Sequence, residues 1–180
     1  MKIGFIGLGN AGGKLANNLL KSGYKLIVMD IDPRILNKFK KKGAFLARSP
    51  KDLAEKSDVI ITCLPSPFAC SKVMTAKNGV LNGLSKNKIW LEMSTTDQSE
   101  VKRIGMMVKK KGSYALDVPV SGGCHRAATG NISIFVGGEK KIFKKVLPIL
   151  KCMGRRILYT GKLGTASILK VITNYLASVH

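Results

Sequence analysis

The sequence predicts an α/β fold, a doubly wound and mostly parallel sheet with helices on both faces. Strand-like apolar runs alternate with helix-like segments along the chain, and this alternation implies right-handed crossovers between parallel strands. The chain has 180 residues, 45% of them apolar, which suits a single domain with one buried core. The first apolar run also leads directly into a glycine-rich turn that opens a helix, a unit typical of this fold class.

Apolar periodicity gives the order of the elements. Strands are predicted at 2–8, 25–30, 58–63, 88–92, 114–117, 132–137 and 156–159. Helices are predicted at 11–22, 33–42, 51–56, 68–75, 97–111, 139–151 and 163–178, several beginning after Asp, Ser or Pro and ending at Gly. No repeat or long linker interrupts the chain, so we expect one domain over residues 1–162. The helical pattern after residue 163 still continues at His180 without a capping residue, which indicates a sequence that stops within a helix.

The charge and the cysteines restrict the kinds of partner. A formal net charge of +21 would suit nucleic acid, but the lysine runs at 40–42, 109–111 and 140–145 fall on separate predicted helices without interleaved aromatic residues. Solvated helix faces explain these runs more simply, so no nucleic-acid partner is predicted. The four cysteines form no Cys-x-x-Cys pair and only two histidines could join them, so we expect neither a metal site nor a disulfide framework.

Hydropathy and the start of the chain bear on location. No stretch approaches about 18 uninterrupted apolar residues, and the first strand-like run begins directly after Lys2. We therefore expect no membrane segment, no leader peptide and a cytoplasmic location.

The glycine-rich turn after the first strand is the first candidate binding motif. It comprises Gly7, Leu8, Gly9, Asn10, Ala11 and Gly12. Gly7 allows a tight turn, Gly9 lets the backbone approach a pyrophosphate, and Gly12 lets the helix pack closely on the strand. The helix N-terminus would also offer free N–H groups to the anion. The motif predicts a dinucleotide site, with an ordinary glycine turn as the alternative.

Asp30, at the end of the second predicted strand, indicates which dinucleotide would bind. A carboxylate at this distance along the chain can accept hydrogen bonds from a ribose diol, and it would repel the 2′-phosphate of NADP. NAD is therefore the predicted cofactor. NADP remains the less favoured alternative because Arg34 is close in sequence.

Two further strands end in segments that could contact the same ligand. Leu64 and Pro65 follow one predicted strand and Thr95 follows the next, and ligands of open α/β sheets bind at the carboxyl ends of strands. Small hydroxyl residues also cap helices. Thr95 therefore has two interpretations, a ligand contact or part of a cap formed by residues 94–97.

Ser121, Gly122 and Gly123 follow the fifth predicted strand. Two adjacent glycines leave backbone N–H groups open to a ligand oxygen, an arrangement that suits a carboxylate. A flexible connecting turn has the same composition and is the alternative.

Lys170 and Asn174 are spaced i, i+4 and share one face of an otherwise apolar helix. Lys170 could extend its ammonium group to solvent along that helix. Alternatively, partial desolvation beside a cofactor would lower its pKa and make it a general acid–base, with Asn174 orienting the substrate.

With these motifs the chain resembles the β-hydroxyacid dehydrogenase family, particularly 3-hydroxyisobutyrate dehydrogenases and tartronate semialdehyde reductases, in their N-terminal NAD-binding domain. The resemblance runs from end to end and includes Ile61-Thr62-Cys63-Leu64-Pro65, Glu92-Met93-Ser94-Thr95-Thr96 and the segment 130–138. It implies a Rossmann-type domain with Thr95 near both cofactor and substrate. It also implies a substrate carboxylate site at Ser121, Gly122 and Gly123, Lys170 as the general acid–base and Asn174 as its assistant.

The chain also departs from the family pattern. Ala11 replaces the methionine usual in the first glycine motif, and Cys124-His125-Arg126 occupies a stretch that varies with substrate. His125 is consistent with a ligand contact or with a partly exposed loop residue. Family members carry an all-helical domain that closes the active site and supplies the dimer contact. The resemblance implies that residues 163–180 begin the interdomain helix, that this helical domain is absent, and that a homo-oligomer requires it.

The predicted function is that of an NAD-dependent oxidoreductase, an enzyme acting on a CH–OH group. It would transfer hydride between nicotinamide and a small carboxylate, a 3-hydroxyisobutyrate-like or 2-hydroxy-3-oxopropionate-like β-hydroxyacid, with Lys170 exchanging the hydroxyl proton. The alternative is a non-catalytic dinucleotide-binding fragment or interaction module.

Overall fold

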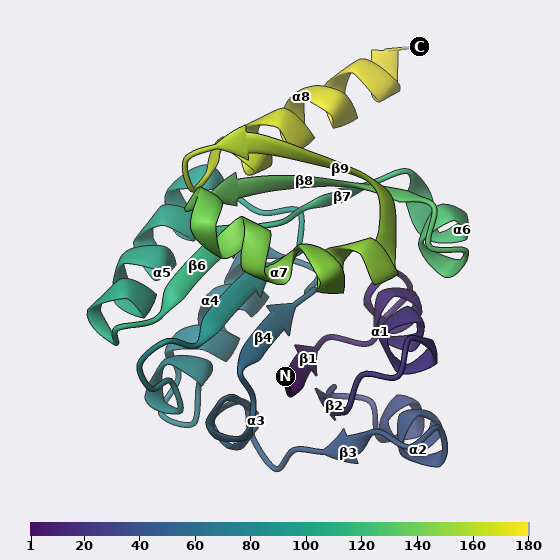
Figure 1. Ribbon diagram of the computed structural model, residues 1–180, viewed down its shortest axis with the longest axis vertical. Helices are drawn as coiled ribbons and strands as arrows, with labels where there is room; N and C mark the ends of the chain where they lie inside the picture. Colours follow the sequence, from purple (N-terminus) through teal and green to yellow (C-terminus); the bar gives the residue numbers. More distant parts are fainter. Residues whose placement is uncertain (180) are drawn as a thin grey trace.

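The computed structural model describes residues 1–179, in which one sheet lies between two layers of helices (Figure 1). The strands are β1 (Ile3–Ile6), β2 (Leu26–Met29), β3 (Phe45–Leu46), β4 (Val59–Thr62), β5 (Ile89–Glu92), β6 (Tyr114–Asp117), β7 (Val120–Ser121), β8 (Ile132–Gly138) and β9 (Gly154–Gly161). The helices are α1 (Gly12–Lys21), α2 (Pro33–Lys41), α3 (Pro50–Lys56), α4 (Pro67–Thr75), α5 (Gln98–Lys110), α6 (Gly123–Ala128), α7 (Lys140–Met153) and α8 (Thr165–Val179), with a 3-10 turn η1 (Val80–Asn82). The predicted doubly wound, mostly parallel fold is confirmed.

The sheet has the strand order β3-β2-β1-β4-β5-β6-β8-β7, with β9 paired to β8. Strands β1 to β6 are parallel, β8 runs antiparallel to β6 and β7, and β9 is parallel to β8. Ile6 pairs with both Met29 and Thr62, Thr62 pairs with Glu92, and Glu92 pairs with Asp117. Five parallel strands therefore end level with one another, along what we call the carboxyl edge of the sheet.

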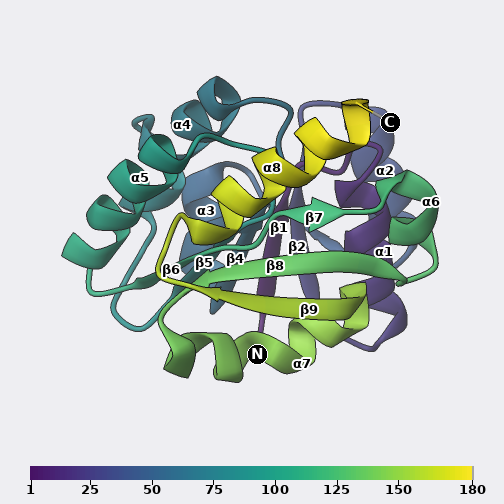
Figure 2. The same cartoon turned by 90° about the horizontal axis from the view of Figure 1, so that it is seen from above.

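Two hydrophobic cores cover the two faces of the sheet. Alternate residues of the central strands point to opposite faces, so that Ile60 and Trp90 pack with α3, α4 and α5 while Ile61 and Leu91 pack with α1, α6 and α7. Figure 2 shows α4 and α5 on one side of the strands and α7 on the other. Burial of β4 and β5 on both faces explains why they read as continuous apolar runs rather than alternating ones.

All seven predicted strands and all seven predicted helices occur, and their ends differ from the predicted ends by two residues at most. Four short elements were not predicted: β3, η1, β7 and α6. Each is too short to show the periodicity of a helix or a strand, which is the signal that located the longer elements.

Asp117, the last residue of β6, fastens α8 to the sheet. Its buried carboxylate accepts hydrogen bonds from the Gly164 N–H at 2.8 Å, from the Ser167 N–H at 2.9 Å and from the Ser167 hydroxyl at 3.1 Å. A negative charge at the N-terminus of a helix also interacts favourably with the helix dipole. The contact fixes where α8 crosses the carboxyl edge (Figure 2).

Glu92, the last residue of β5, holds two loops of that edge together. Its buried carboxylate accepts hydrogen bonds from the Thr62 hydroxyl at 2.6 Å, the Cys70 thiol at 2.7 Å and the Ser94 N–H at 2.7 Å. The Ser94 hydroxyl in turn accepts from the Leu64 N–H at 2.8 Å. Burial raises the pKa of the Glu92 carboxyl, and this effect outweighs the hydrogen bonds that favour its ionised form.

Asp117→Asn should lower the free energy of unfolding by about 2–4 kcal/mol, because an amide can no longer accept from both N–H groups of α8 and leaves a buried donor unpaired. Urea denaturation measures this loss. Asp97→Asn is the matched control, since Asp97 caps α5 at the surface and asparagine is an equally good cap, so it should cost less than about 1 kcal/mol. Equal losses in the two variants would contradict the role of Asp117.

Glu92→Gln should reveal the raised pKa of Glu92. A carboxyl whose pKa is higher in the folded state adds stability that is fully present below its unfolded pKa and is lost as the pH rises through the folded pKa. The unfolding free energy of the native chain, relative to that of the variant, should therefore fall in urea denaturation as the pH rises above 4.5, the ordinary glutamate value.

Glu100→Gln is the control for this titration. Hydrogen bonds from Arg103 lower the pKa of the Glu100 carboxyl, so its contribution is lost as the pH falls rather than as it rises. The unfolding free energy of the native chain should fall with rising pH relative to the Glu92 variant only. A fall relative to both variants, or to neither, would contradict the assignment to Glu92.

Candidate active site

A cavity of about 650 Å³ opens at the carboxyl edge, where β1, β2 and β4 end. Eight of the predicted cofactor residues line it, namely Gly7, Gly9, Asn10, Ala11, Gly12, Asp30, Leu64 and Pro65. Leu8 does not line it, because its side chain is buried in the core and only its backbone faces the loop. The structure therefore gathers into one cavity residues from three separate strand ends.

Side chains at the glycine positions of the loop would either clash with backbone atoms or fill the space that is open to a ligand. Gly7 has φ +93°, and a Cβ at Gly12 would come within 2.0 Å of the Gly7 carbonyl oxygen, so both positions require glycine. At Gly9 the position of a Cβ has no atom within 4 Å, so the backbone there faces open space. Helix α1 begins beside this space with no side-chain cap on its free N–H groups. The loop therefore fits the pyrophosphate of a dinucleotide.

Asp30 lies in the wall of the cavity and is held in place by the backbone. One carboxylate oxygen accepts from the Leu8 N–H at 2.6 Å and the other from the Asp32 N–H at 2.9 Å. Arg34, which could have favoured NADP, instead forms an ion pair with Asp32 at 2.9 Å and does not line the cavity. A carboxylate held by two backbone N–H groups thus forms part of the cavity wall.

Thr95 is exposed and does not cap a helix. The cap of α5 is made by Asp97, which accepts from the N–H groups of Ser99 and Glu100, while Ser94 is buried and bonded to Leu64. The alternative in which Thr95 forms part of the cap is therefore wrong, and the hydroxyl stays available at the carboxyl edge.

Lys170 and Ser121, which are 49 residues apart in the sequence, meet at this edge. The Lys170 ammonium group donates to the Ser121 hydroxyl at 3.3 Å, and the lysine is only 8% exposed. Burial lowers the pKa of Lys170. The alternative in which this side chain extends to solvent is wrong.

Ser121, Gly122 and Gly123 do not form a simple connecting turn. Ser121 ends the short strand β7, and Gly123 begins α6. The two glycines have φ +127° and +78°, are exposed, and directly follow Ser121, which contacts Lys170. His125 was expected in a loop, but it is an exposed residue of α6, a helix too short to be read from the sequence.

Asn174 lies one helical turn beyond Lys170 on α8 and is exposed. The neighbouring apolar side chains of this helix are exposed as well, including Val171, Ile172 and Tyr175. In Figure 1 the last turns of α8 extend beyond the rest of the chain.

Two buried carboxylates that position the site were not identified from the sequence. In the sequence, Asp117 and Glu92 stand out only as members of longer motifs. Each ends a strand of the sheet. A charged residue at the end of an apolar run was the pattern that could have identified them. Cys63 also lines the cavity, but burial raises the pKa of its thiol to about 12, which keeps it protonated at neutral pH.

Residues 1–179 contain no cluster of His, Cys, Asp or Glu suited to a metal ion. No helix within the same range is long and apolar enough to cross a membrane.

Comparisons with known proteins agree with this geometry. The family model for the NAD-binding domain of 6-phosphogluconate dehydrogenase matches residues 2–161. The mitochondrial 3-hydroxyisobutyrate dehydrogenase of Rattus norvegicus is 41% identical over 177 residues, which cover 98% of this chain and 53% of that protein. The NAD-dependent L-serine dehydrogenase of Pseudomonas aeruginosa is 35% identical over 178 residues, which cover 99% of this chain and 60% of that protein.

A solved structure of the Mycobacterium tuberculosis 3-hydroxyisobutyrate dehydrogenase with L-serine superimposes with a TM-score of 0.93 and 28% sequence identity. It covers 99% of this chain, which in turn covers 60% of that one. The chain thus spans about half the length of the curated relatives it matches. By its matched domain and its relatives, the chain belongs to the β-hydroxyacid dehydrogenase family, as an NAD-binding domain of the 6-phosphogluconate dehydrogenase type.

Proposed function

We propose that this chain is the cofactor-binding part of an NAD-dependent dehydrogenase that acts on a small β-hydroxyacid. The observation that carries the proposal is the contact between the buried Lys170 and Ser121 at 3.3 Å, at the same sheet edge as the glycine-lined cavity. The lysine held there has a lowered pKa and lies next to a hydroxyl and two glycine N–H groups. This arrangement suits proton exchange with the hydroxyl of a bound hydroxyacid.

Each residue of the site has a separate task in this proposal. Bound NAD supplies the hydride acceptor, and its reduced form the hydride donor. Lys170, as the neutral amine, takes the proton from the substrate hydroxyl, and as the ammonium ion it returns a proton to the carbonyl oxygen in the reverse direction. The Ser121 hydroxyl, together with the N–H groups of Gly122 and Gly123, holds the substrate carboxylate. Asn174 orients the substrate one helical turn further along α8.

The relatives indicate the substrate class. One is named for 3-hydroxyisobutyrate and another for L-serine, and both compounds carry a hydroxyl on the carbon β to a carboxylate. A carboxylate held at Ser121 would place such a hydroxyl close to Lys170, since the two side chains are in contact. We propose a short β-hydroxyacid as the substrate.

We propose NAD rather than NADP as the physiological cofactor. The Asp30 carboxylate lines the cavity, whereas Arg34 is paired with Asp32 and does not line it. Thr95, exposed at the end of β5, is proposed to contact the cofactor.

The domain organisation remains part of the proposal. Residues 1–162 would form the dinucleotide-binding domain, and α8 would begin the helix that connects it to an all-helical domain and to a homo-oligomeric partner. A cytoplasmic location and the lack of a nucleic-acid partner stay predictions. Because the chain spans about half of its curated relatives, a dinucleotide-binding module without turnover is the second candidate function.

Lys170→Met should abolish turnover and leave cofactor binding intact. Methionine fills a similar volume in the buried position but cannot carry a proton, so the rate of NADH formation with a panel of β-hydroxyacids should fall by about a thousandfold. The dissociation constant of NADH, measured by NADH fluorescence, should change less than about twofold, because the substitution alters the packing only slightly.

Lys162→Met is the matched control, because Lys162 is exposed and lies just before α8. It should leave both readouts unchanged. Loss of NADH binding together with turnover in Lys170→Met would contradict a role in proton exchange. If the native chain forms no NADH with any β-hydroxyacid of the panel but still binds NADH, the result would instead favour the binding module.

Asp30→Asn should shift the choice of cofactor. Without the carboxylate, the 2′-phosphate of NADP is no longer repelled, so the ratio of the NADP to the NAD dissociation constant should fall by at least about tenfold. Calorimetric titration of both cofactors measures it. Asp58→Asn removes the same charge at the opposite end of the sheet and should leave the ratio unchanged. An unchanged ratio in Asp30→Asn would argue that Asp30 does not face the ribose.

A further inference from the structure

A second cavity lies away from the carboxyl edge, between α5, β6, the start of α7 and the loop that follows β9. We call it the α5–β9 cavity. Its volume is about 600 Å³, which is within the usual range for small-molecule sites. None of its lining residues lines the cofactor cavity. It is therefore a separate candidate site, and nothing in the proposed function uses it.

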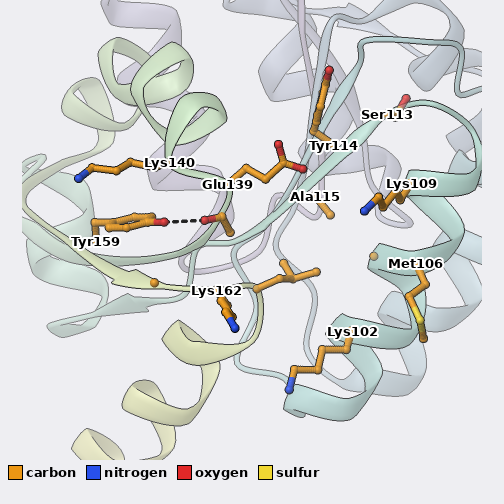
Figure 3. A pocket seen from close by; sticks show the side chains of 14 residues that line it. Lys102, Met106, Lys109, Ser113, Tyr114, Ala115, Glu139, Lys140, Tyr159 and Lys162 are labelled. Atoms are coloured by element: carbon orange, nitrogen blue, oxygen red, sulfur yellow. Dashed lines mark hydrogen bonds between the residues drawn. The ribbon is translucent and has the colours of Figure 1, made fainter.

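Four lysines belong to the lining of the α5–β9 cavity, namely Lys102, Lys109, Lys140 and Lys162. In Figure 3 the Lys140 side chain points away from the other three. None takes part in the four ion pairs found among residues 1–179. Glu139 is the one acidic residue of the lining. In a chain of net charge +21, these lysines have no ion-pair partner that would compete with a bound anion.

Helix α7 adds a further attraction for an anion. Its first residue, Lys140, and the two residues before it belong to the lining. Glu139, the N-cap residue, makes no side-chain hydrogen bond to the free N–H groups of the first turn. The positive end of the dipole of this 14-residue helix therefore faces the same hollow as the lysines.

The walls between the lysines are largely apolar. Met106, Ala115 and Leu163 contribute aliphatic surface. The ring of Tyr159 is fixed on two sides, because its hydroxyl donates to the Gly138 carbonyl oxygen at 2.8 Å (Figure 3) and its face stacks on Phe143 at a centroid distance of 5.2 Å. Such walls suit a flat or aliphatic body of about the size of a small ring system.

We propose that the α5–β9 cavity binds a small organic phosphate, a dianionic group carried on an apolar body. Lysine ammonium groups act as point charges that suit a phosphate, whose negative charge is larger than that of a carboxylate. The phosphate lies among the lysines at the mouth, and the apolar body lies between Met106 and Tyr159.

The test is an NMR titration of the amide-labelled chain with α-naphthyl phosphate, which has both parts. Amides of Gly105, Ala115 and Gly138 should shift, whereas those of Gly9 and Gly12 in the cofactor loop should not. Inorganic phosphate and α-naphthol, each carrying one part only, should bind at least about tenfold more weakly, since each lacks one of the two interactions. Equal affinity for inorganic phosphate, or shifts confined to the cofactor loop, would overturn the proposal.

Met106 offers a matched pair of variants, because it is exposed on α5 in the wall of the cavity. Met106→Glu and Met106→Gln differ only in charge. The glutamate should weaken binding at least about fivefold relative to the glutamine by repelling the phosphate. Equal affinities would overturn the proposal, since they would place the anion outside this cavity.

A second pair of variants separates the cavity from the general positive charge of the chain. Lys102→Gln with Lys109→Gln removes two lysines of the rim, and Lys144→Gln with Lys145→Gln removes two exposed lysines of α7 outside it. Only the first pair should weaken binding. The same loss in both pairs would show non-specific attraction and contradict a site.

Discussion

The position of α8 on the sheet is the constraint on which the candidate active site depends. A single buried carboxylate, Asp117, accepts three hydrogen bonds from Gly164 and Ser167 at the start of this helix. Lys170 lies one turn further along the same helix, so the contact that fixes Asp117 also fixes where the lysine enters the carboxyl edge. The Asp117 side chain has little space around it, because a Cβ at Gly137 would lie within 2.3 Å of its carboxylate. Lys170 is thus positioned by the sheet, although it belongs to a helix whose later turns are exposed.

The cofactor side of the edge is fixed by a second buried carboxylate and by close backbone packing. Glu92 bonds to Thr62 on the adjacent strand and to the start of the loop after β5, and Ser94 of that loop bonds to Leu64. In the glycine-rich loop, Gly7 and Gly12 pack closely against backbone atoms, and the Leu8 N–H donates to the Asp30 carboxylate. Burying a carboxylate without a cation costs stability. Buried polar networks of this kind are nevertheless common where loops must be held in one arrangement.

Much of the fold and of the site could be predicted from the sequence, for identifiable physical reasons. Long elements show clear periodicity, and Gly7, Gly9 and Gly12 lie between a strand and a helix, which gives a common pattern its meaning. The short elements β7 and α6 carry too few residues for that signal, so Ser121 and His125 were expected in turns or loops. The burial of Lys170, its contact with Ser121 and the α5–β9 cavity depend on how distant segments pack, and periodicity along the chain holds no information about that packing.

We propose Lys170 as a buried amine adapted to proton exchange at the carboxyl edge. The titration of Lys170 can be followed by NMR of isotope-labelled lysine side chains in the native chain. We expect that one lysine, identified as Lys170 by its loss in a variant, titrates clearly below 10.5, the ordinary lysine value, because burial disfavours its charged form. If Lys170 titrates at that ordinary value, it is a solvated surface lysine, and the proposed role of Lys170 and Ser121 is wrong.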